Sequence, residues 1–182
     1  MAQQTSSCTY DNMEGKMIKL LYISLGILFL HTAKAYNPKF EKKIKKELTA
    51  VFETHQFTNC KLIQTVIDST TNTTSEIYSI NDGVETHLGY FAISQGEGRF
   101  ETFDFLVIYN HKKQIQKVKI LLYCSTYGYE IGSKRWLRQF EDHKVNHHFK
   151  YTDDIQAISG ATVSARGLTE AINRLNVIIQ DI

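Results

Sequence analysis

Four small residues near the C-terminus of the chain, Ser159-Gly160-Ala161-Thr162, stand directly before an apolar period. Ser159 is a residue type that caps helices through its hydroxyl oxygen, and a cap alone is enough to explain it. Gly160 would let a ligand approach the backbone, and the free N–H groups and dipole of a following helix attract anions. The Thr162 hydroxyl would project beside such an anion. The turn therefore has two interpretations, an ordinary helix start and a site for a phosphate or carboxylate.

The segment after this turn predicts an amphipathic helix that closes the chain. Apolar residues recur there at three- and four-residue spacing, which puts them on one helical face. They are Leu168, Ala171, Ile172, Leu175 and Ile179.

The segment before the turn predicts a sheet of strands joined by short turns. Residues 101–110 alternate apolar and polar side chains, with Phe103, Phe105, Val107 and Tyr109 on one face. Residues 115–126 give a further strand, with Val118, Ile120 and Leu122 on one face. Gly96 and Gly98 indicate a tight turn between strands rather than a nucleotide cradle. Consecutive strands without intervening helices predict an antiparallel sheet.

A helix is expected to open the domain, beginning at Asn37-Pro38 and ending near Phe52 or Glu53. Its buried face would carry Phe40, Ile44, Leu48, Val51 and Phe52. Helix and strand both fit residues 60–70. The prediction is an α+β fold: an antiparallel sheet with a leading N-terminal helix and a C-terminal amphipathic helix.

The first 35 residues have the pattern of a secretory signal peptide. Lysines stand on both sides of Met17, an apolar run of 11 residues spans 20–30, and Ala33-Lys34-Ala35 is a small-residue cleavage site. Such a run is shorter than the roughly 20 residues of a membrane helix. We expect cleavage before Tyr36, a true start at Met17, and one domain over residues 36–182. The expected location is the periplasm or another exported compartment, with membrane association as an option.

Composition and cysteine content narrow the class of protein. A chain of 182 residues with 42% apolar and 22% charged residues can bury one real core. A net charge of +2 is too small for a nucleic-acid-binding protein. Cys60 and Cys124 in the mature part could form one disulfide or remain two free thiols. His143 and His147 read as solvated loop histidines, so no metal site is expected.

The stretch ISGATVSARGLTEAI, residues 158–172, resembles the signature of the FMN-binding domain family. The resemblance implies that FMN is the cofactor and that Thr162 receives it through a phosphoester bond. A separate, magnesium-dependent flavin transferase that uses FAD would make this bond. Ser159, Gly160 and Ala161 would form the turn around the phosphate, in agreement with the anion interpretation of the helix start.

The resemblance extends over about residues 89–175 and includes a loop that lies over the flavin ring in exported relatives. The corresponding residues here are Thr126, Tyr127 and Gly128, and Tyr127 could stack on the ring. The sequence departs from the family pattern at Gln156, where an acidic residue is usual, and at Cys124-Ser125, where relatives often have arginine and glutamate.

The resulting hypothesis is an exported FMN protein that transfers electrons outside the cytoplasm. A membrane redox protein would be its electron donor or acceptor, and the chain would be a carrier rather than a stand-alone enzyme. Two alternatives remain: non-covalent FMN binding, and a flavin-free binding or scaffold module of the same fold.

Overall fold

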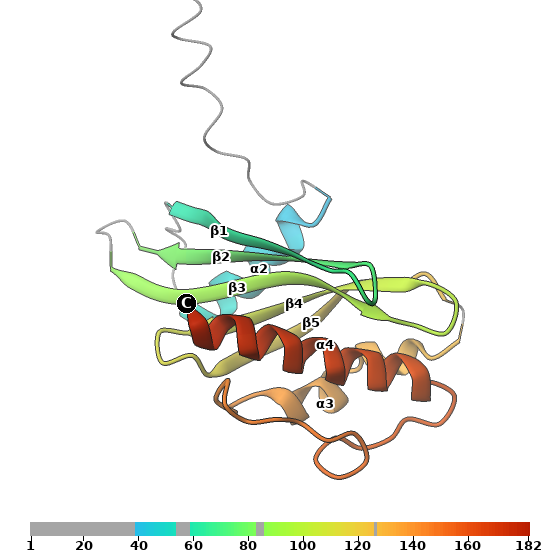
Figure 1. Cartoon of the computed structure of the whole chain (residues 1–182). Helices are drawn as coiled ribbons and strands as arrows, with labels where there is room; N and C mark the ends of the chain where they lie inside the picture. Colours follow the sequence, from blue (N-terminus) through green and yellow to red (C-terminus); the bar gives the residue numbers. More distant parts are fainter. Residues whose placement is uncertain (1–38, 54–58, 83–85, 126) are drawn as a thin grey trace, which may run out of the picture. The chain divides into compact units, whose positions relative to one another are not determined.

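Five strands follow one another in a single antiparallel sheet in the computed structural model, which describes residues 39–53, 59–82, 86–125 and 127–182 (Figure 1). Their spatial order β1-β2-β3-β4-β5 is also their order along the chain. The strands are β1 (Asn59–Asp68), β2 (Thr73–Asn81), β3 (His87–Glu97), β4 (Thr102–Asn110) and β5 (Ile115–Leu122). The helices are α2 (Glu41–Phe52), α3 (Lys134–Leu137) and α4 (Thr162–Asp181), and short 3-10 turns span Tyr129–Gly132 and Arg138–Phe140.

The sheet separates two apolar cores. On one face α4 and the segment around α3 cover the alternating residues of β4, all of which are buried as the pattern predicts. On the other face Ile44 and Leu48 of α2, together with its N-cap residue Phe40, pack against the opposite side chains of the sheet, among them Leu106 and Ile108. Strand β4 is therefore buried on both sides, and Figure 1 shows α4 crossing one face of the sheet while α2 lies behind it.

Helix α4 confirms the predicted amphipathic period. All five of the apolar residues on which the prediction rested are buried, each with an exposed fraction of 2% or less. One polar pair reinforces this interface, because the Tyr109 hydroxyl donates a 3.1 Å hydrogen bond to Asn176 Oδ1 inside the core. The fold class is α+β with a leading helix, an antiparallel sheet and a closing helix, as predicted.

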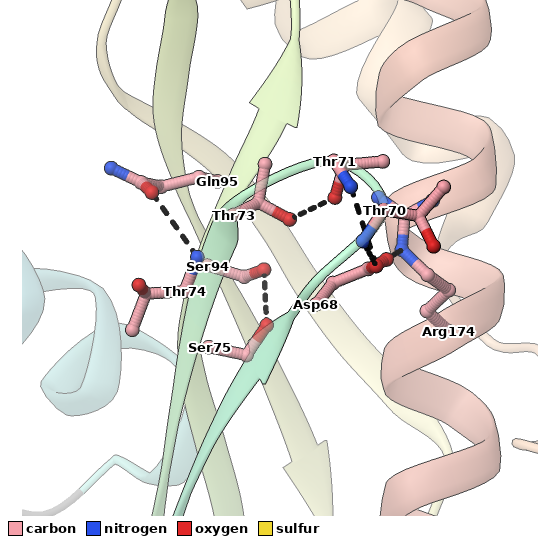
Figure 2. Close-up of polar contacts among 9 residues, drawn as sticks. All are labelled: Asp68, Thr70, Thr71, Thr73, Thr74, Ser75, Ser94, Gln95 and Arg174. Carbon is pink, nitrogen blue, oxygen red and sulfur yellow. Dashed lines mark hydrogen bonds and ion pairs between the residues drawn. The ribbon is translucent and has the colours of Figure 1, made fainter.

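The tip of the β1–β2 hairpin is tied to α4 through a carboxylate (Figure 2). Asp68 accepts hydrogen bonds from the N–H groups of Thr70 and Thr71, and its Oδ2 lies 3.3 Å from Arg174 Nε. These N–H donors, followed by the charge of Arg174, hold the pKa of Asp68 below its usual value. Arg174 belongs to α4, so the Asp68 side chain points to the α4 side of the sheet.

Three details differ from the sequence prediction or resolve it. The ambiguous segment 60–70 is strand β1 up to Asp68 and a turn beyond it, and α2 begins at Glu41 rather than at residue 37. Leu122 does not share a face with Val118 and Ile120. The β4–β5 register shifts between Asp104 and Phe105, so β5 contains one extra residue there. The side-chain alternation is reversed beyond that point, and Leu122 packs on the α2 side.

The predicted signal peptide and its cleavage site lie outside the described residues. In the part of the chain that the structure describes, no helix is long and apolar enough to cross a membrane. Cys60 is half-buried and Cys124 exposed, and both are free thiols. Burial raises the pKa of the Cys60 thiol, so it remains protonated near neutral pH.

Candidate functional site

Three segments that are distant in the sequence meet at a cleft at one end of the sheet. They are the β3–β4 turn, the loop that follows β5, and the first turn of α4. The cleft has a volume of about 370 Å³, which lies within the range of small-molecule sites. Its lining residues are Arg99, Phe100, Tyr123, Ser125, Tyr127, Gly160, Ala161, Thr162, Val163 and Ser164.

The start of α4 differs from the predicted capped start. The helix begins at Thr162, its N-cap is Ala161, and no side chain caps it; Ser159 lies in the preceding turn. The expectation that Ser159 caps the helix is therefore wrong, because the turn continues through Gly160 and the N-cap moves two residues on, to Ala161. Among the described residues, nothing accepts a hydrogen bond from the N–H groups of Thr162, Val163 and Ser164.

Gly160 has the backbone conformation that opens this helix start. Its φ of +81° lies in the left-handed region that side chains disfavour. A Cβ at Gly160 would meet no atom within 4 Å, so the space beside it is open toward the cleft. The uncapped N–H groups, the positive end of the helix dipole and this open space together make an anion site.

The loop after β5 is locked against the same helix turn. Gly128 has a φ of +77°, and a Cβ there would lie 2.9 Å from the Ala161 Cβ. The Tyr123 hydroxyl donates to the Tyr127 carbonyl at 2.9 Å and lies 3.0 Å from the Ser164 hydroxyl oxygen. Because the Tyr123 proton is already donated to this carbonyl, the Ser164 hydroxyl is the donor to Tyr123. The loop and the helix start therefore form one hydrogen-bonded unit.

Exposed aromatic side chains form the outer walls of the cleft. Phe100 and Tyr127 are each 77% exposed, and Val163 is 49% exposed. Large apolar side chains that line one cleft and remain exposed to water mark a place where a ligand or partner binds and covers them. Arg99 is the charged side chain among the lining residues, and its guanidinium lies 5.3 Å from the centre of the Phe100 ring.

The predicted site residues fall into three groups. Gly160, Ala161, Thr162 and Tyr127 line the cleft together. Ser159 and Gly128 stand next to it without lining it; Gly128 acts through its contact with Ala161. Thr126 lies outside the described residues.

The wall contributed by the β3–β4 turn is not predicted by the sequence motifs. Arg99 and Phe100 belong to the glycine-containing segment whose pattern indicates only a tight turn. A signal was available, because in an antiparallel meander the β3–β4 turn and the end of β5 lie at the same end of the sheet.

Hydrogen bonds hold the backbone of Gln156, where the sequence lacks the usual acidic residue, and the carboxylate of the nearby Asp154. The Trp136 indole donates to the Gln156 carbonyl at 2.7 Å, and the Gln156 N–H donates to Gln139 Oε1 at 2.8 Å. The Gln156 side chain itself is exposed. Asp154 accepts from the Lys150 N–H at 2.8 Å and lies 3.8 Å from His147 Nε2, so its carboxylate is turned into its own loop.

These features fit a flavin mononucleotide. A phosphate matches the uncapped helix start, and an aromatic ring system matches walls made of Phe100, Tyr127 and Val163. The Thr162 hydroxyl is exposed at the junction of the two regions, and within the described chain it has no hydrogen-bond partner.

Comparison with known proteins agrees with this chemistry. Residues 98–176 match the family model of the FMN-binding domain, and every residue that lines the cleft falls in that segment. No curated protein matches the chain. The fold and the cleft thus define a flavoprotein with FMN as its cofactor. More particularly, residues 98–176 of the chain are an FMN-binding domain.

Proposed function

We propose that the chain is an exported FMN carrier in which the FMN phosphate is joined to the Thr162 hydroxyl oxygen. The observation that carries the proposal is the uncapped first turn of α4. Three N–H groups converge there, and Thr162, the first helical residue, presents an exposed hydroxyl in the same turn. A helix start with a capping side chain would have used these donors internally.

Attachment requires a transferase and FAD as co-reactant. The Thr162 oxygen attacks the phosphorus atom on the riboflavin side of the FAD pyrophosphate. One P–O bond forms to threonine, the P–O bond of the pyrophosphate bridge breaks, and AMP leaves. The hydroxyl proton passes to a base of the transferase, since the described residues offer no carboxylate or imidazole that lines the cleft.

The other walls of the cleft would hold the ring system. Phe100 and Tyr127 come from different loops, and their exposed faces supply apolar contact for an isoalloxazine. Arg99 supplies a positive charge in the same wall. This charge offsets the absence of an arginine at position 124, where this chain has cysteine.

Electron transfer follows from the chemistry of the cofactor rather than from a catalytic side chain. FMN supplies one- and two-electron redox chemistry when bound. The cleft residues position it and set the charge around it. We propose a membrane redox protein as the electron donor or acceptor, on the outer side of the membrane that a cleaved signal peptide would direct the chain across.

Intact mass spectrometry of protein exported from a host with a flavin transferase tests this proposal. The wild-type chain should carry one added FMN phosphoester, and Thr162→Ala should abolish it. Ser159→Ala is the matched control, because this exposed hydroxyl belongs to the neighbouring turn but does not line the cleft. The same spectrum tests cleavage before Tyr36.

Each contrary result has a distinct meaning. A yellow protein that loses its colour on denaturation and has no added mass would refute the covalent bond, with Gln156 as the first cause to examine. A colourless wild-type chain from the same host would refute the carrier function itself. Added mass that survives Thr162→Ala would refute the assignment of the attachment residue.

A further inference from the structure

Strand β1 is an edge strand with exposed apolar side chains. It pairs with β2 on one side, and no other described strand pairs with its outer side. Leu62, Ile63 and Ile67 are 40%, 41% and 67% exposed. Figure 1 shows β1 at the border of the sheet, away from β3 and β5, where the two main helices make their contacts. An open edge with apolar side chains is a template for pairing with another strand.

The faces of β1 follow from its pairing with β2. Leu62 pairs with Tyr78 and Ile67 with Thr74, which places both on the α2 side of the sheet. Lys61 pairs with Ser79 and so lies on the opposite, α4 side. Asp68 lies on that α4 side too, as its contact with Arg174 shows independently (Figure 2).

A bulge divides the strand. The register shifts between Leu62 and Gln64, so Ile63 is the extra residue. Without a bulge, positions separated by an odd number of residues would face opposite sides. With it, Leu62 and Ile67 share one side, and Lys61 and Asp68 share the other.

We propose that β1 is a self-association surface on which a second copy of this chain pairs antiparallel, about a two-fold axis at Thr65. Such an axis stands perpendicular to the sheet, so each residue meets a residue of the same side. Thr65 then faces its own copy, and Gln64 faces Val66 of the second copy. Beyond the bulge, Leu62 meets Ile67, and Lys61 meets Asp68.

The complementarity of this register favours a second copy over an unrelated strand. The exposed apolar residues of the α2 side cover each other twice across the axis. On the α4 side the single lysine of the strand meets the single carboxylate twice. A lysine and a bulge usually deter edge pairing. Here the two-fold axis accommodates both features. Each Lys61 meets an Asp68, and the two bulges lie at the same distance from Thr65 on opposite sides of the axis.

Disulfide crosslinking tests the axis directly. In the full chain with Cys8, Cys60 and Cys124 replaced by alanine, Thr65→Cys should form a covalent dimer on mild oxidation. Directly opposite residues have Cα atoms about 4.5–5.5 Å apart, within disulfide range. Leu62→Cys is the control, because its two copies lie five residues apart along the pair, roughly 16 Å.

The register has its own test. Leu62→Cys mixed with Ile67→Cys should give a crosslinked heterodimer, although neither variant crosslinks alone. Ile67→Lys should weaken self-association at least about tenfold in analytical ultracentrifugation, since it buries an unpaired charge. Its thermal unfolding as a monomer should stay unchanged, because this side chain is two-thirds exposed in the single chain.

Two results would overturn the proposal. The first is a wild-type chain that sediments as a monomer at its highest soluble concentration, with no Thr65→Cys dimer. The second is a dimer in which Leu62→Cys crosslinks as readily as Thr65→Cys, or which Ile67→Lys leaves intact; that dimer would use another surface. Neither result depends on FMN, so the test is separate from that of the proposed function.

Discussion

Replacing Gly128 with alanine should loosen the loop that closes the FMN cleft. This residue has a φ of +77°, and an added Cβ would lie 2.9 Å from the Ala161 Cβ and 3.0 Å from the Tyr123 hydroxyl oxygen. Ala161 is the N-cap of α4, so relief of this contact must move either the loop or the helix start. Both movements would widen the cleft between the first turn of α4, where the phosphate would bind, and the Tyr127 side chain.

The magnitude has two parts. A non-glycine residue in the left-handed region costs roughly 1–2 kcal/mol. An extra methyl group in a filled contact costs typically about 1–3 kcal/mol. We therefore expect Gly128→Ala to lower the free energy of unfolding by about 2–5 kcal/mol.

Two other glycines separate these parts. Gly160 has a φ of +81° but nothing within 4 Å of an added Cβ, so Gly160→Ala should cost only the backbone part, roughly 1–2 kcal/mol. Gly132 has neither a positive φ nor a close neighbour. Gly132→Ala should be neutral or stabilising by about 0.4–1 kcal/mol, because it restricts the unfolded chain.

Urea unfolding of the three variants, with FMN titrated into the same samples without transferase, gives the comparison. The expected order of stability is Gly132→Ala, then Gly160→Ala, then Gly128→Ala, and FMN affinity should fall furthest in Gly128→Ala. If Gly128→Ala costs no more than Gly160→Ala, the contact with Ala161 is not tight, and the reasoning on loop locking is wrong.

Two further predictions concern the core and its titration. Tyr109→Phe removes the buried donor to Asn176 and should lower the free energy of unfolding by about 1–3 kcal/mol, whereas the exposed Tyr129→Phe should leave urea unfolding unchanged. Partial desolvation, with the charge of His147 adding to it, lowers the pKa of the exposed His143 below its ordinary 6.5. The unfolded chain takes up this proton first, so stability should be complete above pH 6.5 and fall as the pH drops through the folded pKa. Unfolding midpoints between pH 7.5 and 5 measure this, and an equally steep fall in His143→Gln would contradict it.

The periodic spacing of apolar residues predicted the strands and helices that bury one face in a core. Phe103 to Tyr109 and Leu168 to Ile179 repeat at the periods of a strand and a helix, and both sets are buried where they were expected. The choice between helix and strand for segment 60–70 stayed open because β1 is an edge strand, and its exposed apolar residues do not pack in either core. Leu122 was assigned to the wrong face because a bulge changes alternation without leaving a residue signature.

The candidate site was predictable only where its residues are contiguous. Gly160, Ala161 and Thr162 form one motif, and the structure brings them into the cleft. Arg99 and Phe100 reach it through the sheet topology, which must be known before their position can be derived. The cap was misassigned because Ser159 is a favourable capping residue, whereas the positive φ of Gly160 delays the helix by two residues.

The cleft draws its walls from the middle, the later part and the end of the chain. One of these contributors, α4, also completes one of the two cores, so the chain cannot present the Thr162 turn in its native form before α4 has packed on the sheet. An enzyme that recognises this turn by shape would modify only molecules that have finished folding. Under the proposed attachment, the yellow colour of a preparation would thus measure its correctly folded fraction, and a truncation before Thr162 would remove the attachment residue, one wall of the cleft and the α4 side of a core together.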